Sequence, residues 1–376
     1  MADLLTSVAG KGWRDHPSYG AGQRRITRIA MGIDSLTAGG GTVSSTYRTT
    51  FMGALRAKYG NAGYGWSKID DLLDGAATFT SATCVGITSL DWADAKRVTA
   101  AFGGGVYCLS QTTASLFVGL ATADPNIVAG SLDFMFTDAG QSFQLLQRGS
   151  TGQTITISAS NYSLNVPQRV TIPFVYGGSN QSGFALQNVN TNGANYLYVY
   201  GKEFHYSNSV AGVDFANLGT SGTKMSDWAG LDETAFTKWL RIVRPDYFLL
   251  NGGINDRGSS LTNSYTGMVP TAVTFQRSLE TVLRRIQAAI PPCKVMLVIP
   301  NETSDMATTA LSYMDEIIAG AATAYGHALH DDRAVLGTYA AALAAGYMDG
   351  IDGIHPTPSG NSVRGNAYAG RFALAP

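Results

Sequence analysis

The segment Tyr247-Phe-Leu-Leu-Asn251, followed closely by Gly253-Ile-Asn255-Asp256, carries the strongest structural signal in the chain. The first five residues come after Pro245 and form a continuous run dominated by large apolar side chains. Such a run is typical of a strand buried on both faces of a parallel sheet. The sequence therefore predicts a buried strand that ends just before a loop carrying Asn255 and Asp256.

Helices and strands alternate on both sides of this segment. Downstream, a predicted helix from Phe275 to Ile290 stops at Pro291-Pro292, and a buried strand follows from Lys294 to Pro300. Alternation of this kind indicates a parallel sheet that is covered by helices on both faces. The other predicted elements are strands at Ile26 to Met31 and Val213 to Asn217, and helices at Thr49 to Tyr59, Glu233 to Val243, about Thr309 to Tyr325 and after Pro358.

The middle of the chain, from about residue 70 to residue 206, has a different character. Its apolar segments are short and β-rich, and clusters of Gly, Ser, Asn and Gln separate them, which is typical of an all-β sandwich. We therefore expect a jelly-roll-like sandwich (66–206) inserted into an α/β domain whose two parts are 1–65 and 207–376. The candidate strands are Leu132 to Phe136, Thr154 to Ser158, Val170 to Tyr176 and Tyr196 to Tyr200.

Composition narrows the range of partners. The 376 residues suggest two units, and a net charge of -1 offers no basic stripe, so nucleic acid is not an expected partner. Three cysteines, Cys84, Cys108 and Cys293, cannot all pair and form no C-x-x-C motif, so buried thiols are expected.

Neither end of the chain nor its interior predicts a membrane segment. The N-terminus lacks the basic flank and apolar run of a signal peptide, and no stretch reaches the ~20 apolar residues of a spanning helix. The sequence thus predicts a soluble protein without membrane insertion, which leaves its cell, if at all, by lysis, assembly or another route.

Three candidate functional residues follow predicted strands. Ser35, Gly222 and Asn255 each come just after one. Because active sites in open parallel sheets form at the carboxyl ends of the strands, we expect these residues to share one edge of the sheet.

Together with one histidine, these residues suffice for ester hydrolysis. A serine hydroxyl is a weak nucleophile until a base takes its proton, and His355 has Asp352 three residues earlier to orient it. The oxyanion donors would be the N–H groups of Ser35 and Gly222 and the side-chain amide of Asn255.

The candidate residues lie in four short segments, which read Ile33-Asp34-Ser35-Leu36, Asn217-Leu-Gly-Thr-Ser-Gly222, Gly253-Ile-Asn255-Asp256 and Asp352-Gly-Ile-His355-Pro356. These segments resemble the blocks of the SGNH (GDSL-type) hydrolase family. Ile33 stands where the family has a glycine, and Gly219 remains an alternative to Gly222. The resemblance covers about residues 26–59 and 213–373. It implies a flavodoxin-like three-layer fold and hydrolysis through an acyl-enzyme, with no cofactor and no metal.

A β-sandwich between the nucleophile and glycine blocks resembles a subset of this family. Such proteins look like carbohydrate O-acetylesterases, including peptidoglycan O-acetylesterases and phage tail-fibre or tailspike esterases. The resemblance implies that the substrate is an acetylated bacterial polysaccharide and that residues 66–206 are carbohydrate-binding-like. With no signal peptide, it also suggests a virion (phage tail) or extracellular location after lysis, with a homo-oligomer, a trimer in a tail protein, left open.

Several alternatives stay open at this point. The chain could be a non-catalytic glycan-binding tail protein, or an esterase or lipase for lipid-like esters. His327 and His330 with Asp331 and Asp332 could bind a metal, although a helix end running into a strand is the favoured interpretation. The tyrosines of the segment Tyr196 to Tyr200 could stack on sugar rings. For those whose side chains point inward, packing in the core of the sandwich is the favoured interpretation, since strand faces alternate.

Overall fold

The computed structural model describes residues 26–34, 36, 46–68, 87–89, 107–109, 116–120, 126–148, 154–173, 182–192, 197–206, 212–219, 222–256, 271–304 and 313–372, and every structural statement concerns these residues. The chain divides into two compact units. The α/β unit comprises Met1–Ala62, Asn208–Gly230 and Pro245–Pro376. The β unit comprises Gly63–Ser207 and Leu231–Arg244.

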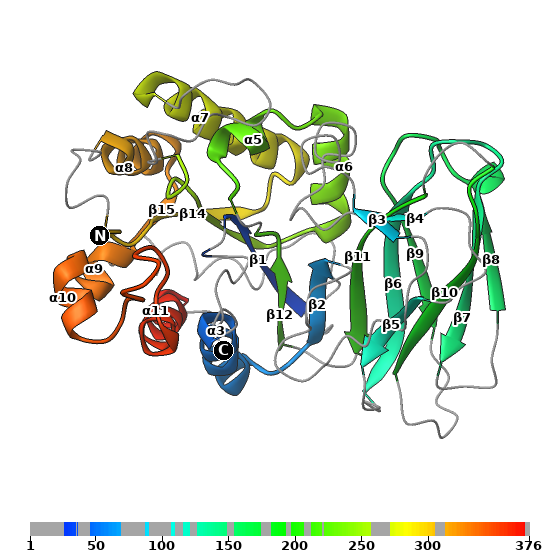
Figure 1. The fold of residues 1–376 in the computed structure, drawn as a ribbon, viewed down its shortest axis with the longest axis horizontal. Helices are drawn as coiled ribbons and strands as arrows, with labels where there is room; N and C mark the ends of the chain where they lie inside the picture. Colours follow the sequence, from blue (N-terminus) through cyan, green and yellow to red (C-terminus); the bar gives the residue numbers. More distant parts are fainter. Residues whose placement is uncertain are drawn as a thin grey trace. The chain divides into compact units, whose positions relative to one another are not determined.

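The sheet of the α/β unit has five parallel strands in the order β12-β1-β13-β14-β15 (Figure 1). Counted within this unit, the order is 2-1-3-4-5, which is that of flavodoxin-like folds. Since all strands run the same way, their carboxyl ends lie along one edge. The strands are β1 (Ile26–Ile33), β12 (Gly212–Asn217), β13 (Tyr247–Asn251), β14 (Lys294–Ile299) and β15 (Ala328–Asp331).

Helices cover both faces of this sheet, as the alternation predicted. In Figure 1, α5, α7 and α8 lie on one side and α3 and α11 on the other. Trp228 of α5 packs against Phe248 of β13, and a Cβ at Gly32 would collide with the same indole ring. The helices are α3 (Thr46–Tyr59), α5 (Met225–Ala229), α7 (Ala272–Ala289), α8 (Tyr313–Tyr325), α9 (Asp332–Leu336), α10 (Tyr339–Ala344) and α11 (Pro358–Arg371).

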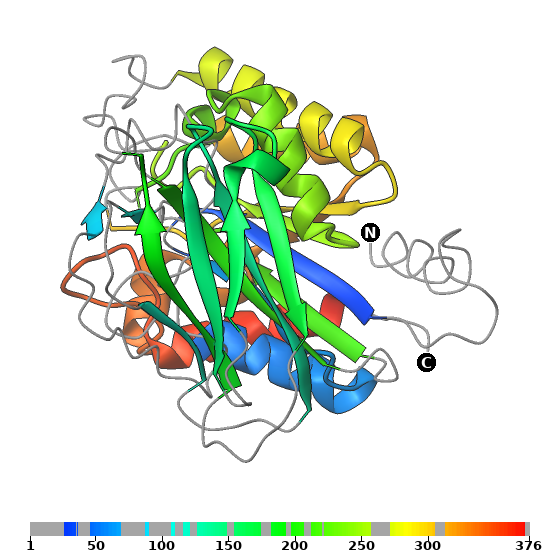
Figure 2. The same cartoon turned by 90° about the vertical axis from the view of Figure 1, so that its right-hand side faces the viewer.

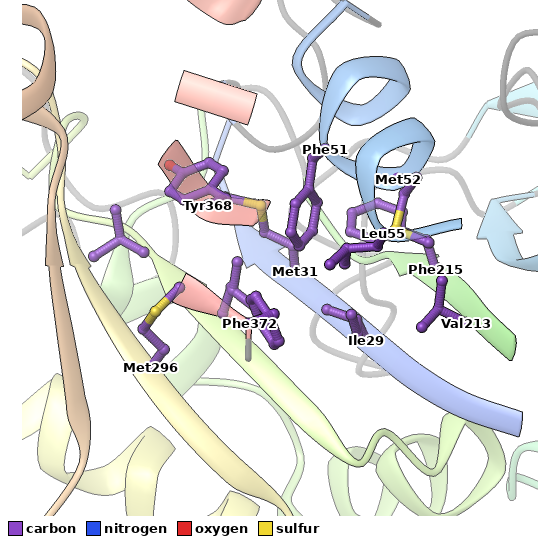
Figure 3. Packing of buried hydrophobic residues seen from close by; sticks show 12 residues of the cluster. Ile29, Met31, Phe51, Met52, Leu55, Val213, Phe215, Met296, Tyr368 and Phe372 are labelled. Atoms are coloured by element: carbon purple, nitrogen blue, oxygen red, sulfur yellow. The ribbon is translucent and has the colours of Figure 1, made fainter. Parts of the chain in front are cut away.

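The core between the sheet, α3 and α11 centres on Phe51 (Figure 3). This ring from α3 lies 6.3 Å from Phe215 of β12, 5.9 Å from Tyr368 of α11 and 5.6 Å from Phe372, measured between ring centroids. Phe51 is fully buried. Within the described residues, α3 and α11, which lie near opposite ends of the sequence, are thereby joined through a single aromatic cluster.

The predicted helix limits shift where caps decide them. α7 begins at Ala272, three residues before the predicted Phe275, because the Thr271 hydroxyl accepts the N–H of Thr274 at 3.2 Å and caps the first turn. A helix was predicted after Pro358, and α11 begins at this proline itself, with Thr357 as the capping residue.

The described strands of the β unit form two antiparallel sheets. One has the order β5-β10-β7-β8, and the other the order β3-β4-β11-β6-β9 with β2 also paired to β11. Each predicted strand overlaps an observed one. The strands are β2 (Gly63–Lys68), β3 (Ile87–Ser89), β4 (Tyr107–Leu109), β5 (Leu116–Leu120), β6 (Ile127–Met135), β7 (Ser142–Arg148), β8 (Thr154–Ser158), β9 (Gln168–Pro173), β10 (Ser182–Asn190) and β11 (Leu197–Tyr206), with a 3-10 turn, η1 (Ala159–Asn161).

Aromatic side chains pack between these two sheets, whose strands Figure 2 shows face on. Phe134 of β6 meets Phe143 of β7 at 5.1 Å, and Phe184 of β10 meets Phe204 of β11 at 6.1 Å. The extra antiparallel sheets are consistent with an inserted β domain. The domain limits at residues 65/66 and 206/207, and the carbohydrate-binding character of the insert, stay predictions.

The helix α6 (Glu233–Val243) has the limits that the sequence predicted, but it groups with the β unit. Its Trp239 lies 4.5 Å from the ring of Tyr200, which is itself buried on β11. At Tyr200, therefore, the tyrosine-rich strand contributes to core packing.

Among the described residues, none of the helices combines the length and hydropathy that a membrane-spanning helix needs.

Candidate active site

The turn that follows β1 holds the neighbours of Ser35. The N–H of Leu36 donates to Asp34 Oδ1 at 3.0 Å, and both residues are buried. Ser35 itself lies outside the described residues. The carboxyl end of β1 thus locates the backbone on either side of the predicted nucleophile.

The loop after β12 separates the two candidate glycines. Asn217 Oδ1 accepts the N–H of Gly219 at 3.2 Å, and both residues are buried. Gly222 is exposed and has φ +74°, a left-handed conformation that favours glycine. The Gly219 N–H is therefore engaged within its own turn, while Gly222 is the glycine that the backbone conformation requires.

The loops after β12 and β13 are joined by two hydrogen bonds. Asn255 Nδ2 donates to the carbonyl of Thr223 at 2.9 Å, and the N–H of Met225 donates to Asp256 Oδ2 at 3.0 Å. A side-chain amide carries two N–H donors, so this bond fixes the orientation of the Asn255 amide and leaves its second N–H for a ligand. The fold brings Gly222 and Asn255 into neighbouring loops, as the strand-end argument predicted.

Three charged residues in these loops and in α5 are buried: Lys224, Asp227 and Asp256, of which only Asp256 belongs to a motif recognised in the sequence. Burial raises the pKa of Asp256 to about 7; the charge of Asp227 adds to the shift, and the Met225 N–H and Lys224 oppose it. Burial likewise lowers the pKa of Lys224, against the attraction of both carboxylates. The Lys224 N–H donates to Asp227 Oδ2 at 2.9 Å, which closes the start of α5.

His355 and Asp352 are in direct contact. His355 Nδ1 lies 2.7 Å from Asp352 Oδ2, while Asp352 Oδ1 accepts the N–H groups of Ile354 at 2.8 Å and His355 at 2.9 Å. Partial burial acts to raise the pKa of Asp352, but these hydrogen bonds and the charge of His355 outweigh it and hold the pKa below its ordinary value. The carboxylate is thus kept ionised beside the imidazole, as a residue that orients a histidine requires.

The loop that carries this pair is bound to the segment after β14. The N–H of Ser304 donates to the carbonyl of Gly353 at 2.9 Å, and Asn301 Nδ2 donates to the carbonyl of Ile354 at 3.1 Å. Gly353 has φ +67°, and a Cβ there would collide with the Ser304 side chain. Sequence reasoning missed Asn301, although a polar residue directly after a buried strand was a usable signal.

His330 and His327 lie on β15 and just before it. His330, on β15, has Nε2 at 3.2 Å from Asp332 Oδ1, and His327 follows α8 and stacks on Tyr325. Burial lowers the pKa of His327. Within the part of the chain that the structure describes, no group of three or more His, Cys, Asp or Glu residues is placed to hold a metal ion.

The β unit contains a serine in contact with a histidine. Ser131 Oγ lies 2.7 Å from His205 Nε2, and His205 Nδ1 lies 3.4 Å from Glu203 Oε1. Ser131 is fully buried and its hydroxyl also bonds Thr171 at 2.8 Å. Since no substrate can reach a fully buried hydroxyl, this arrangement is a structural cross-strand network.

Comparison with known proteins adds a family and a fold. A sequence model of the GDSL-like Lipase/Acylhydrolase family matches residues 175–363, just over half of the chain. That range contains Gly222, Asn255, Asp352 and His355, and it excludes Ser35. No curated protein matches the sequence significantly.

Among solved structures, a peptidoglycan O-acetylesterase matches with a TM-score of 0.65 at 15% identity, over 98% of this chain and 93% of its own. A GDSL-like lipase from Parabacteroides merdae matches at 19% identity over 43% of this chain and 74% of its own, with a TM-score of 0.36. A catalytic mutant of an acetylxylan esterase from Geobacillus stearothermophilus matches at 16% identity over 43% and 74%, with a TM-score of 0.34. The first match extends over nearly the whole chain, and the predicted SGNH fold class is confirmed.

Proposed function

The chain belongs to the GDSL-like lipase/acylhydrolase family and is a carboxylic ester hydrolase, and we propose that it removes O-acetyl groups from a bacterial surface polysaccharide through an acyl-enzyme. The observation that carries this proposal is the contact of 2.7 Å between His355 Nδ1 and Asp352 Oδ2, in a loop bound to the carboxyl end of the sheet. The same edge carries the turn around Ser35 and the loops of Gly222 and Asn255.

The proposed reaction uses four side chains and two backbone groups. Ser35 Oγ attacks the acetyl carbonyl while His355 Nε2 takes its proton, and Asp352 stabilises the imidazolium that forms. The N–H groups of Ser35 and Gly222 and Asn255 Nδ2 bind the developing oxyanion. His355 then protonates the leaving sugar oxygen and activates the water that releases acetate.

Gly222, rather than Gly219, is the proposed oxyanion donor. The Gly219 N–H already donates to Asn217 Oδ1, whereas Gly222 sits in the loop that Asn255 holds through Thr223. A donor must point at the oxyanion and not at a neighbouring side chain, so the engaged Gly219 N–H is the weaker candidate.

The proposed substrate draws on the structural similarity that extends over nearly the whole chain. The similar structure that extends over nearly the whole of this chain is a peptidoglycan O-acetylesterase, which favours an acetylated bacterial glycan: capsule, O-antigen or peptidoglycan. We further propose that the inserted β unit binds that glycan and that the protein acts in a phage tail or outside the cell after lysis.

A second candidate function is hydrolysis of lipid-like esters. Ile351 is 98% exposed and Ile354 is also exposed, and they flank Asp352 on both sides. Exposed aliphatic side chains beside a catalytic pair could bind an acyl chain. Activity that rises with acyl length from acetyl to octanoyl esters would favour this candidate over an O-acetylesterase.

Two measurements test the proposed function. Ser35→Ala should abolish hydrolysis of 4-nitrophenyl acetate while leaving the thermal midpoint close to that of the wild type. Full activity in this variant would exclude Ser35 as the nucleophile. Acetate release from a panel of capsules, O-antigens and peptidoglycans would then identify the glycan, and glycan binding without release from any of them would point to the non-catalytic alternative.

A further inference from the structure

The backbone on either side of His355 is held at three consecutive carbonyl oxygens. Those of Ile354, His355 and Pro356 each accept a hydrogen bond from elsewhere in the α/β unit. The donors are Asn301 Nδ2 (3.1 Å), the Asp349 N–H (2.9 Å) and Asn361 Nδ2 (3.1 Å). Two buried asparagines and one backbone group therefore restrain the backbone from which the His355 side chain leaves, in addition to the bonds from its N–H groups to Asp352.

Asn361 is in turn oriented by Arg364, one turn further along α11. Arg364 Nη1 donates to Asn361 Oδ1 at 3.0 Å, so the Asn361 amide uses both of its ends, accepting from the guanidinium and donating to Pro356. This also assigns the amide, since a flipped Asn361 would place its NH₂ group against a guanidinium donor.

Arg364 is fixed by a fully buried carboxylate. Its Nε and Nη2 lie 2.9 Å and 2.8 Å from Asp332 Oδ2, and both side chains are completely buried. Tyr368 Oη donates to the same oxygen at 2.8 Å. The planar guanidinium thus contacts Asp332 with one edge and Asn361 with another, which a lysine ammonium cannot reproduce.

Stability alone does not explain a buried ion pair of this kind. Removing two charges from water costs several kcal/mol per ion, and well-packed apolar replacements of buried pairs are often neutral or about 1–4 kcal/mol more stable. What apolar side chains cannot supply is a directional bond to Asn361, and through it a fixed Pro356 carbonyl beside His355.

We propose that Asn361, held by the buried Arg364–Asp332 pair, is a positioning residue that fixes the orientation of His355. This inference rests on the proposed role of His355 as the catalytic base. A misplacement of a catalytic group by about 1 Å can reduce turnover by about 10²-fold. A bond that restrains the backbone of His355 therefore affects kcat as well as stability.

The test is the variant Asn361→Asp, which keeps an acceptor for Arg364 and loses the donor to Pro356. We expect kcat for 4-nitrophenyl acetate to fall about 10- to 100-fold, with KM changed less than about twofold. The matched control is Tyr59→Phe, which removes a hydroxyl that donates to the Phe372 carbonyl at 3.1 Å, at the other end of α11. The control should retain wild-type kcat.

A second readout does not depend on activity. The NMR signal of the proton between His355 Nδ1 and Asp352 should shift or broaden in Asn361→Asp and stay unchanged in Tyr59→Phe. If the wild type hydrolyses no ester, the proposed function fails, and the NMR comparison alone decides the positioning role.

Two results would overturn the inference. One is an Asn361→Asp protein with wild-type kcat and an unchanged His355 signal. The other is an equal loss of kcat in Asn361→Asp and Tyr59→Phe, which would assign the effect to the stability of α11. Should Asn361→Asp fail to fold, Asn361→Ser removes the same donor with no buried charge added, and the same comparisons apply.

Discussion

Asn255 has both an observed structural contact and a proposed catalytic role. One N–H of its amide holds the Thr223 carbonyl at 2.9 Å, and the other is free of that bond to meet an oxyanion. Asn255→Ala should therefore lower kcat by about 10²–10³ with little change in KM, because an oxyanion bond forms only in the transition state. Steady-state kinetics check this, and a raised KM at unchanged kcat would instead assign Asn255 to substrate binding.

Asn251 shows the opposite case, a polar residue with no evident task. It is fully buried at the end of β13, and among the described residues neither atom of its amide has a hydrogen-bond partner. Replacing an unsatisfied buried amide by an apolar side chain of similar size removes a cost of about 1–3 kcal/mol.

Asn251→Leu should accordingly raise the free energy of unfolding in urea. Asn251→Ala is the control, since it removes the amide without filling its volume, and it should be less stable than Asn251→Leu. A leucine variant less stable than the wild type would mean that the amide is hydrogen-bonded in solution.

At the scale of elements, α3 and α11 depend on each other through the aromatic cluster of Figure 3. Phe51 contacts Phe215, Tyr368 and Phe372 and is fully buried. Phe51→Ala should cost about 3–5 kcal/mol, because it removes apolar contacts and leaves a cavity between two helices and the sheet. Phe51→Leu should cost clearly less.

Chemical denaturation of both variants measures this difference. A loss below about 1 kcal/mol in Phe51→Ala would show that α3 contributes little to holding α11 on the sheet. The helix α11 also carries Asn361 and Arg364, so a change in its packing is expected to reach the proposed positioning of His355.

For the whole molecule, the buried carboxylates predict opposite effects of pH on stability. The pKa of Asp332 lies below its ordinary value: burial would raise it, but Arg364 and His330 outweigh that effect. Asp332 therefore stabilises the fold at neutral pH, and this contribution is lost as the pH falls through its lowered pKa. Asp256 is the reverse case, since its folded pKa of about 7 lies above the ordinary value of 3.8.

Between pH 3.8 and about pH 7, the folded protein keeps a proton on Asp256 that the unfolded chain releases. The contribution of Asp256 is thus fully present below the ordinary pKa and is lost as the pH rises through about 7. Asp256→Asn should remove this decline, which is on the order of a few kcal/mol. Urea unfolding of the wild type and of Asp256→Asn at pH 5 and pH 8 measures this decline. If the two proteins differ in free energy of unfolding by the same amount at both pH values, Asp256 is not the group responsible.

Local sequence patterns predicted most elements because burial and chain breaks are encoded within a few residues. The run Tyr247 to Asn251 is a strand with those limits, and α6 has its predicted limits. The grouping of α6 with the β unit could not be read in this way, because Trp239 meets Tyr200 across 39 residues of sequence.

The sequence by itself determined the order of the main helices and strands of the α/β unit, because that order depends on local periodicity. Short motifs predicted the candidate residues Ser35, Gly222, Asn255, Asp352 and His355, and a change in composition predicted an insert between the first helix and the second strand of this unit. Only the tertiary structure decided which polar groups support the site. Asn301 from the segment after β14 and Asn361 from α11 both bind the His355 loop. Lys224, Asp227 and Asp256 are buried together because the parallel strands bring the loops after β12 and β13 to one edge. Such partners depend on distances across the fold, which no pattern of neighbouring residues specifies.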